Sequence, residues 1–151
     1  MIRLVTGDIL ESNAEALVNT VNCAGVMGKG LAAQFKEAYP ENYRLYRVAC
    51  IKNEVQLGKM FTFQTRAKDG GPQFIINFPT KEHWKMKSNM ADIESGLQDL
   101  VVTIARHGIC SIAIPGLGCS NGGLKWVDVR PRIESAMSAL LPSVDVQLYE
   151  P

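Results

Sequence analysis

The segment ALVNTVNCAGVMGKGLAAQ, residues 16–34, restricts the fold of this chain more than any other part of it. It begins with a short apolar run, passes through the amide-bearing Asn19 and Asn22, and enters a glycine-containing loop before a helical pattern starts at Leu31. Glycine lets backbone N–H groups approach an anion, and a helix N-terminus adds positive dipole there. The segment therefore predicts a strand, a turn and a phosphate-binding loop. Its glycine spacing fits neither the dinucleotide G-x-G-x-x-G motif nor the Walker motif.

A second glycine-rich loop, GLGCSNGG at residues 116–123, follows the apolar run SIAIP and precedes another helical pattern. In open α/β sheets ligands gather outside the carboxyl ends of the strands, so both loops are expected at the same edge. Two such loops suggest a ligand that carries more than one phosphate, or a phosphate and a sugar. The alternative is that the glycines serve only to make tight turns.

Apolar runs and helical periodicity alternate along the chain. This alternation predicts an α/β protein with a largely parallel sheet, in which residues 1–151 form a single domain. The segment KDGGP, residues 68–72, is predicted to be a hairpin turn. Ser88 or Asn89 is expected to cap the third helix, and Gly108 to end it. The predicted strands are 2–5, 16–19, 60–64, 73–78, 111–115 and 144–149, and the predicted helices span about 28–39, 41–52, 88–107 and 126–140.

The composition indicates a soluble globular protein. Hydrophobic residues make up 46% of the 151 residues, charged residues make up 21%, and the net charge is +1. A charge this close to neutral argues against a broad electrostatic grip on nucleic acid but leaves room for a local basic patch. The N-terminal MIRLVTGDIL has no signal-peptide pattern, and no run approaches the length of a membrane span. We therefore expect a cytoplasmic protein with no membrane partner.

The cysteines are scattered and form no C-x-x-C pair. Reduced thiols are therefore expected rather than disulfides, and neither a structural zinc site nor any other metal site is predicted. A catalytic cysteine–histidine pair stays open on paper, although nothing in the sequence ties either histidine to a cysteine. The residues concerned are Cys23, Cys50, Cys110, Cys119, His83 and His107.

Two polar residues lie where predicted strands end. Asp8 follows the first strand, where its carboxylate could accept from an exocyclic amine such as that of adenine while the Ile9 N–H donates to a ring nitrogen. The alternative is that Asp8 caps a helix or turn. Asn22 lies at the mouth of the first glycine loop, and its amide can both donate and accept, which suits a pair of ribose hydroxyls. The alternative for Asn22 is ordinary turn chemistry.

Lys81 is the strongest candidate for a reactive group. It is predicted in a short loop with Pro79 and Thr80, directly after the buried strand IINF. A lysine amine in a dry pocket can lose its proton near neutral pH and act as a nucleophile or base. It can also stay charged and stabilise a leaving group. The alternative is a solvated surface lysine.

The segment KEHWKMK, residues 81–87, interleaves basic and aromatic side chains. Such a pattern suits single-stranded nucleic acid, because lysines contact the backbone and an aromatic ring stacks on a base. The candidate contacts are His83, Trp84, Lys85 and Lys87. The alternative is a polar loop with one buried tryptophan.

These residues together resemble the macrodomain family, over essentially the whole chain. The matching motifs are GDI at 7–9, ALVNTVN at 16–22 and IPGLGCSNGG at 114–123. The resemblance implies a three-layer α/β/α fold around a six-stranded, mixed but mostly parallel sheet. Within the family, NFPTKEHW at 77–84 and GVMGKGLAAQFK at 25–36 are similar to the lysine-dependent branch, which includes the terminal ADP-ribose glycohydrolases and the DarG-type macrodomains.

The resemblance also implies roles for single residues. Asp8 and the Ile9 N–H would hold adenine, Asn22 would orient the distal ribose, Lys81 would be catalytic, and Tyr149 would lie along the adenine. Residues 25–31 and 116–122 would surround the pyrophosphate and distal ribose. The full set expected at the ligand is Asp8, Ile9, Thr20, Asn22, Gly28, Lys29, Gly30, Leu31, Thr80, Pro115, Gly116, Leu117, Gly118, Cys119, Ser120, Asn121, Gly122 and Tyr149.

The activity that the resemblance implies is hydrolysis of ADP-ribose from thymine bases of single-stranded DNA. This would reverse DNA modification by the transferase toxin DarT and so act as an antitoxin, with ADP-ribose as ligand and no cofactor. A further region, beyond these residues, would contact the toxin. The alternatives are an ADP-ribose-binding module without turnover, deconjugation of ADP-ribose from protein side chains, and a small phosphate-site protein for another nucleotide.

One departure from the family pattern bears on the mechanism. Related glutamate-deconjugating enzymes carry an aspartate in the second glycine loop, whereas this chain has CSNGG there, without an acid. Lys81 is therefore expected to work with Asn22 and backbone donors instead.

Overall fold

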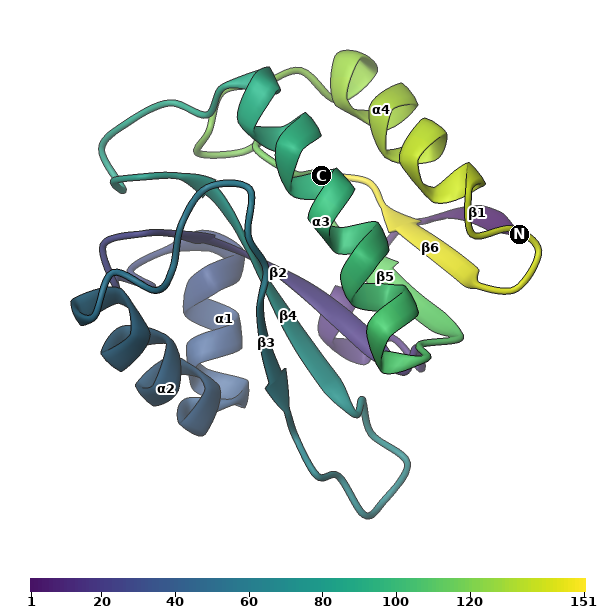
Figure 1. The fold of residues 1–151 in the computed structure, drawn as a ribbon, viewed down its shortest axis with the longest axis horizontal. Helices are drawn as coiled ribbons and strands as arrows, with labels where there is room; N and C mark the ends of the chain where they lie inside the picture. The colour runs from purple at the N-terminus through teal and green to yellow at the C-terminus, as the bar shows by residue number, and fades with distance from the viewer.

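The computed structural model describes residues 1–151 as one six-stranded sheet with four α-helices (Figure 1). The predicted α/β class and the mixed, mostly parallel sheet are confirmed. A short 3-10 helix, η1 (Ile9–Glu11), follows the first strand. The strands are β1 (Ile2–Val5), β2 (Ala16–Asn22), β3 (Phe61–Gln64), β4 (Phe74–Lys81), β5 (Ser111–Ile114) and β6 (Asp145–Tyr149), and the helices are α1 (Gly30–Ala38), α2 (Pro40–Ile51), α3 (Met90–His107) and α4 (Trp126–Ser138).

The sheet has the order β1-β6-β5-β2-β4-β3. Every neighbouring pair is parallel except β3 and β4, which are antiparallel with Phe61 opposite Asn77 and Gln64 opposite Phe74. The predicted hairpin connection through residues 68–72 is thus confirmed. Because β2, β4, β5, β6 and β1 run the same way, the loops that follow them gather along one edge.

Helices cover both faces of the sheet, as Figure 1 shows. Helices α3 and α4 enclose the larger core, which includes Ile76 and Phe78 of β4 and Leu100 of α3. Helices α1 and α2 cover the opposite face, where Phe35 of α1 and Tyr46 of α2 are completely buried. Apolar residues on both faces explain why the central strands read as nearly continuous hydrophobic runs.

Both central strands are longer than predicted. The strand predicted at 16–19 continues to Asn22, and the one predicted at 73–78 continues to Lys81. The prediction of Pro79, Thr80 and Lys81 as a loop was therefore wrong. Beyond Asn77, β4 has a strand neighbour only on its β2 side, so the missing N–H of Pro79 is tolerated. This extension brings Lys81 level with Asn22 across the two strands.

The helix ends follow local rules. The side chain of Asn89, not that of Ser88, caps α3 by accepting from the Ala91 N–H at 2.9 Å. Gly108 ends the helix in the left-handed conformation with φ 63°. Pro40 occupies the first turn of α2, where a missing N–H costs nothing.

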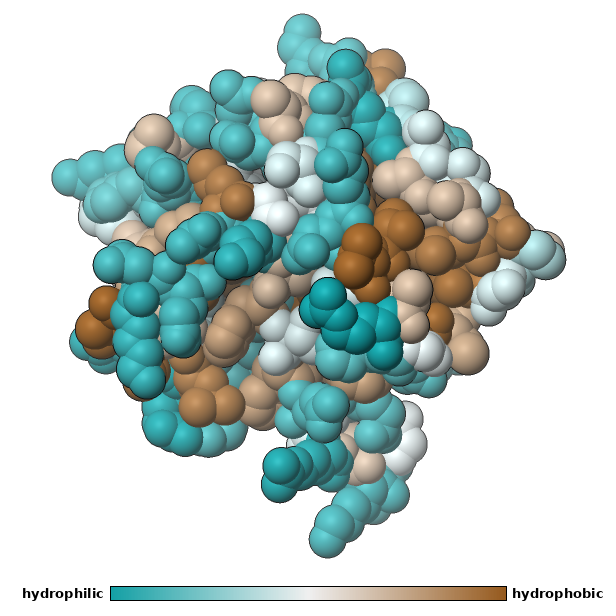
Figure 2. Space-filling model, viewed as in Figure 1, coloured by the Kyte–Doolittle hydropathy of each residue, from teal (hydrophilic) through white to brown (hydrophobic).

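The surface is mostly hydrophilic on the face shown in Figure 2, with hydrophobic residues in separate groups. None of the helices combines the length and the apolar character that crossing a membrane requires. The four cysteines are unpaired, as predicted.

Candidate active site

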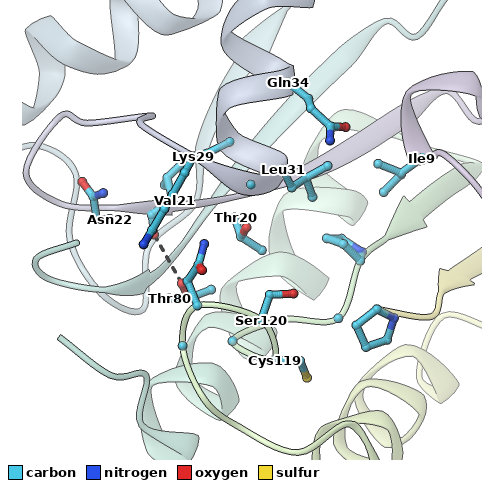
Figure 3. Close-up of a pocket in the computed structure, with 18 of the residues that line it drawn as sticks. Ile9, Thr20, Val21, Asn22, Lys29, Leu31, Gln34, Thr80, Cys119 and Ser120 are labelled. Carbon is cyan, nitrogen blue, oxygen red and sulfur yellow. Dashed lines mark hydrogen bonds between the residues drawn. The ribbon is translucent and has the colours of Figure 1, made fainter. Parts of the chain in front are cut away.

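A cavity of about 890 Å³ opens at the edge where the parallel strands end. Figure 3 shows Lys29, Leu31 and Gln34 on one side of it and Cys119 and Ser120 on the other. Ile9 and Asn22 lie toward opposite ends, and Thr20 lies between them. The two glycine loops thus form facing walls, as their predicted positions required.

The first glycine loop, residues 22–30, is held in shape by the side chain of Asn22. Its Oδ1 accepts from the Ala24 N–H at 2.9 Å, and its Nδ2 donates to the Val26 carbonyl at 2.8 Å. The Tyr46 hydroxyl donates to the Asn22 carbonyl at 2.7 Å. The turn chemistry weighed as an alternative for Asn22 is therefore present, although the residue also lines the cavity.

Helix α1 begins at this loop without a side-chain cap. Lys29 occupies the cap position in an extended conformation and makes no capping hydrogen bond, so the first N–H groups of the helix are free of such a partner. Gly28, Lys29, Gly30 and Leu31 all line the cavity. The helix end therefore offers N–H donors and positive dipole to an anion there.

The second glycine loop, residues 116–123, is held by backbone hydrogen bonds. The Leu124 N–H donates to the Gly118 carbonyl, and the Ser88 N–H donates to the Gly122 carbonyl, each at 2.9 Å. A Cβ on Gly122 would lie 2.3 Å from the Ser88 Oγ and 2.5 Å from the Gly118 carbonyl oxygen. Glycine is required at position 122 because this turn is too close for any side chain.

Lys81 lies at the end of β4 and lines the cavity. Its Nζ donates to the Trp84 carbonyl at 3.2 Å. Burial and the nearby positive charges of Lys87 and Lys29 lower the pKa of Lys81 below its usual range. Beside it in the wall, Thr80 is buried, and its hydroxyl contacts the Val21 carbonyl at 3.5 Å (Figure 3).

The far end of the cavity is formed by the segments after β1 and β6. The Asp8 carboxylate accepts from the Leu10 N–H at 3.0 Å, so the alternative capping role of Asp8 is present. Its second oxygen has no hydrogen bond within the chain. Ile9 and Tyr149 are both nearly buried and pack in the same hydrophobic cluster. The Ile9 and Tyr149 side chains thus give this end an apolar surface, which a base-binding site requires.

Of the predicted ligand residues, all but Leu117 line this cavity. The Leu117 side chain is completely buried in the core under α3 and α4, so it points away from the cavity. The roles of the lining residues stay predictions. Further lining residues were not individually assigned a ligand role, although all but the last two lie within the motifs quoted from the sequence; they are Gly7, Val21, Val26, Ala32, Gln34, Glu150 and Pro151.

The basic segment after β4 lies at the rim. Trp84 lines the cavity and is 44% exposed, so the alternative of a buried tryptophan was wrong. The His83 ring stacks on it at 5.0 Å between centroids, and the Lys85 Nζ lies 4.9 Å from its ring centre. His83, Lys85 and Lys87 are outside the cavity. An exposed ring with a lysine beside it is the kind of arrangement used for stacking on single-stranded nucleic acid.

The sequence profile of the Macro domain matches residues 18–133, most of the chain. The protein belongs to the macrodomain family. The resemblance proposed from its motifs is thus confirmed, and this macrodomain's cavity occupies the edge where the family motifs meet.

Three relatives are similar over essentially the whole macrodomain. A DNA ADP-ribosyl glycohydrolase of Mycobacterium tuberculosis is 52% identical over 151 residues, 100% of this chain and 42% of the relative. The DNA ADP-ribosyl glycohydrolase of Thermus aquaticus is 50% identical, covering 100% of this chain and 41% of that protein. A transferase–glycohydrolase fusion protein of Thermosipho africanus is 38% identical, covering 99% and 42%. The chain therefore spans about two-fifths of the length of these relatives.

Solved structures agree. The macrodomain of M. tuberculosis DarG superposes with a TM-score of 0.98, covering 100% of this chain and 98% of that one at 52% identity. T. africanus DarTG in complex with ADP-ribose superposes with a TM-score of 0.89 at 37% identity, covering 99% and 42%. The similarity to DarG-type macrodomains predicted from residues 25–36 and 77–84 is confirmed.

Proposed function

We propose that this macrodomain hydrolyses the bond between ADP-ribose and a thymine base in single-stranded DNA. The observation that carries the proposal is the position of Lys81, whose amine has a lowered pKa and lies in the cavity wall at the end of β4, level with Asn22. An amine at this place would supply the reactive group that a pure binding pocket does not need. The named relatives, DNA ADP-ribosyl glycohydrolases at 50–52% identity, support the same substrate.

The cavity suits the parts of ADP-ribose. The free N–H groups at the start of α1 and the backbone of residues 116–122 would bind the pyrophosphate between the facing loops. Asp8 and Ile9 would hold the adenine at the apolar end. Binding energy from these remote contacts would then fix the distal ribose beside Asn22 and Lys81. No metal or cofactor takes part in this scheme.

The reaction would proceed by breaking the bond between C1″ of the distal ribose and N3 of thymine. Positive charge develops on the sugar, and the thymine leaves with a negative charge spread over two carbonyls. Water supplies the hydroxyl group to C1″ and the proton to the base. Three roles fit the Lys81 amine: stabilising the departing base as an ammonium, removing a proton from water, or attacking C1″. The lack of an acid in residues 119–123 is compatible with a leaving group that requires no strong general acid.

The DNA strand would leave the cavity past the exposed Trp84. Its ring would stack on a neighbouring base, while Lys85 and Lys87 would contact phosphates. The modified thymine would then lie near Lys81, whose amine donates a hydrogen bond to the Trp84 carbonyl.

The biological partner we propose is a DNA ADP-ribosyltransferase toxin of the DarT kind. The T. africanus relative joins a DNA ADP-ribosyl transferase and a glycohydrolase in one protein, which supports a functional pairing. Removal of the modification from DNA would make this domain an antitoxin by its activity. Control of the toxin by direct binding is not part of the role proposed for these residues.

The test uses a single-stranded oligonucleotide with ADP-ribose on thymine, beside a protein ADP-ribosylated on glutamate. The wild type should release ADP-ribose from the DNA, and Lys81→Ala should abolish release while ADP-ribose still binds in calorimetry. Lys68→Ala, in the distant hairpin loop, serves as the matched control and should keep full activity. Release by Lys81→Ala at the wild-type rate would overturn the proposal. No release by the wild type, with binding intact, would identify a binding module instead.

A further inference from the structure

Tyr46 lies behind the cavity wall, outside the cavity itself. It belongs to α2, its side chain is 0% exposed, and it does not line the site. Its hydroxyl lies 2.7 Å from the Asn22 carbonyl oxygen and 3.0 Å from the Asn22 Oδ1. A hydroxyl has one proton, so the two contacts share it. Burial raises the pKa of Tyr46 above its usual range, and the group therefore stays a donor at every working pH.

Hydrogen bonds within the protein engage the amide oxygen of Asn22 but only one of its two amide hydrogens. Its Oδ1 faces the Tyr46 hydroxyl and accepts from the N–H groups of Ala24 and, at 3.4 Å, Val26, and its Nδ2 donates one hydrogen to the Val26 carbonyl. These partners fix the orientation of the amide, because a backbone N–H must meet oxygen and a carbonyl must meet nitrogen. A primary amide has a second N–H, which is the polar group of the side chain left without a protein partner. Asn22 also lines the cavity and lies toward one end of it (Figure 3).

Helix α2 is itself anchored by a buried amide one turn before Tyr46. Asn42 and Asn77 of β4 exchange two hydrogen bonds, at 3.2 and 2.8 Å, and both are 0% exposed. Residues four apart lie on the same helix face, so Asn42 and Tyr46 form two polar anchors along one face of α2. They attach the helix to the strands that carry Asn22 and Lys81. Buried polar contacts of this kind fix a position more strictly than apolar packing does.

We propose that Tyr46 is a positioning residue that holds the Asn22 amide with its N–H, rather than its carbonyl, toward the distal sugar of ADP-ribose. This inference rests on the proposed function for the identity of the ligand. It narrows the role predicted for Asn22, which was a group that could both donate to and accept from ribose hydroxyls. With the oxygen held from behind, Asn22 donates to a hydroxyl oxygen, and the proton of that hydroxyl must go to another acceptor.

The first experiment compares Tyr46→Phe with Tyr43→Phe, a matched change on the same helix at a tyrosine whose hydroxyl makes no hydrogen bond within the chain. Binding of ADP-ribose and of ADP, which lacks the distal ribose, is measured by calorimetry. Tyr46→Phe should weaken ADP-ribose binding about tenfold, the effect of one hydrogen bond, and ADP binding several-fold less. Tyr43→Phe should change neither. Equal losses for both ligands, or none, would overturn the inference.

A second measurement tests the contact with Asn22 directly. In an Asn22→Ala background the Tyr46→Phe change should cost little further ADP-ribose affinity, since the Oδ1 that the hydroxyl contacts is gone and only the backbone carbonyl of residue 22 remains. If the double variant instead loses affinity by the full product of the two single losses, Tyr46 does not act through the Asn22 side chain.

A third measurement needs no ligand, so it separates this inference from the proposed function. Amide hydrogen exchange at Ala24, whose N–H is bonded to Asn22 Oδ1, should be at least several-fold faster in Tyr46→Phe than in wild type or Tyr43→Phe. Unchanged exchange would overturn the positioning role even if ADP-ribose binds as proposed. A wild type that does not bind ADP-ribose would overturn the function and the sugar contact, while faster exchange would still support the hold of Tyr46 on the loop.

Discussion

The two glycine loops that face each other across the cavity are stabilised in opposite ways. The first, residues 22–30, depends on side chains behind it, because Asn22 and Tyr46 supply the hydrogen bonds that shape it. The second, residues 116–123, depends on the absence of side chains, because its backbone turns leave no room for a Cβ at Gly122. The difference shows that two loops of similar composition can be sensitive to different substitutions. The first is sensitive to loss of a hydrogen-bonding side chain, and the second is sensitive to the addition of a side chain.

The largest effect is expected from adding a methyl group to the second loop. In Gly122→Ala the new Cβ would contact the Gly118 carbonyl, which is backbone and cannot rotate away, so the loop must open. Opening of the loop should misplace its backbone N–H groups and lower the affinity for ADP-ribose by roughly 100-fold, as measured by calorimetry. Gly71→Ala is the control, because its Cβ would meet only the Ala67 Cβ, at 3.7 Å. Near-normal affinity in Gly122→Ala would show that the second loop accommodates a side chain, and the two glycine loops would then not differ in this way.

Removing the Asn22 side chain, which holds the first loop, should have a smaller effect. It should lower both the stability of the protein and its affinity for ADP-ribose. Asn22→Ala leaves the Val26 carbonyl and the Ala24 N–H without their partner, which should lower the free energy of unfolding by about 1–3 kcal/mol. Urea denaturation measures this loss. Asn13→Ala is a comparison at an exposed amide whose Oδ1 accepts from Gln147 outside the cavity, so it should leave ADP-ribose affinity unchanged. Asn22→Ala with full stability would mean that the backbone alone shapes the loop.

A moderate effect is expected from removing the positive charge of Lys87, which lies near Lys81. Lys87 is one of the like charges that lower the pKa of Lys81, so Lys87→Ala should raise that pKa. The alkaline inflection in the pH profile of kcat should therefore move to higher pH. If the neutral amine reacts, the rate below the inflection also falls; if the ammonium acts, the rate persists to higher pH. Lys85→Ala is the control, because Lys85 is not among the charges that shift Lys81.

The smallest effect is expected at the buried hydroxyl behind the second loop. The Ser88 Oγ is buried without a hydrogen-bond partner, so Ser88→Ala should change the free energy of unfolding by no more than about 0.5 kcal/mol. Ser88→Thr should instead weaken ADP-ribose binding, because its added methyl group lies against the backbone of the tight Gly118–Gly122 turn. Denaturation and calorimetry measure the two effects. A substantial loss in Ser88→Ala would reveal a partner for the hydroxyl.

The parts of the site that the sequence revealed are those with local causes. Glycine loops, the Asn89 cap and Lys81 are visible because each depends on residues close to it in the chain. The strand end at Lys81 was placed wrongly, since Pro79 breaks most strands and only the one-sided pairing of β4 makes it acceptable here. Tyr46 gave no signal at all. Its role depends on packing α2 against β2, which no pattern within either segment records.

Three lysines gather near the end of β4, where the positive charges of Lys29 and Lys87 repel that of Lys81. Burial lowers the pKa of Lys81, and Lys87 and Lys29 lower it further; a diphosphate that enters between the loops would raise it again by bringing negative charge. Ligand binding would then be coupled to proton uptake from the solvent, and product release to its return. The heat of ADP-ribose binding should accordingly depend on the ionisation enthalpy of the buffer, more strongly at alkaline pH than at neutral pH. The protonation state of the Lys81 amine would thus report whether the cavity holds a ligand.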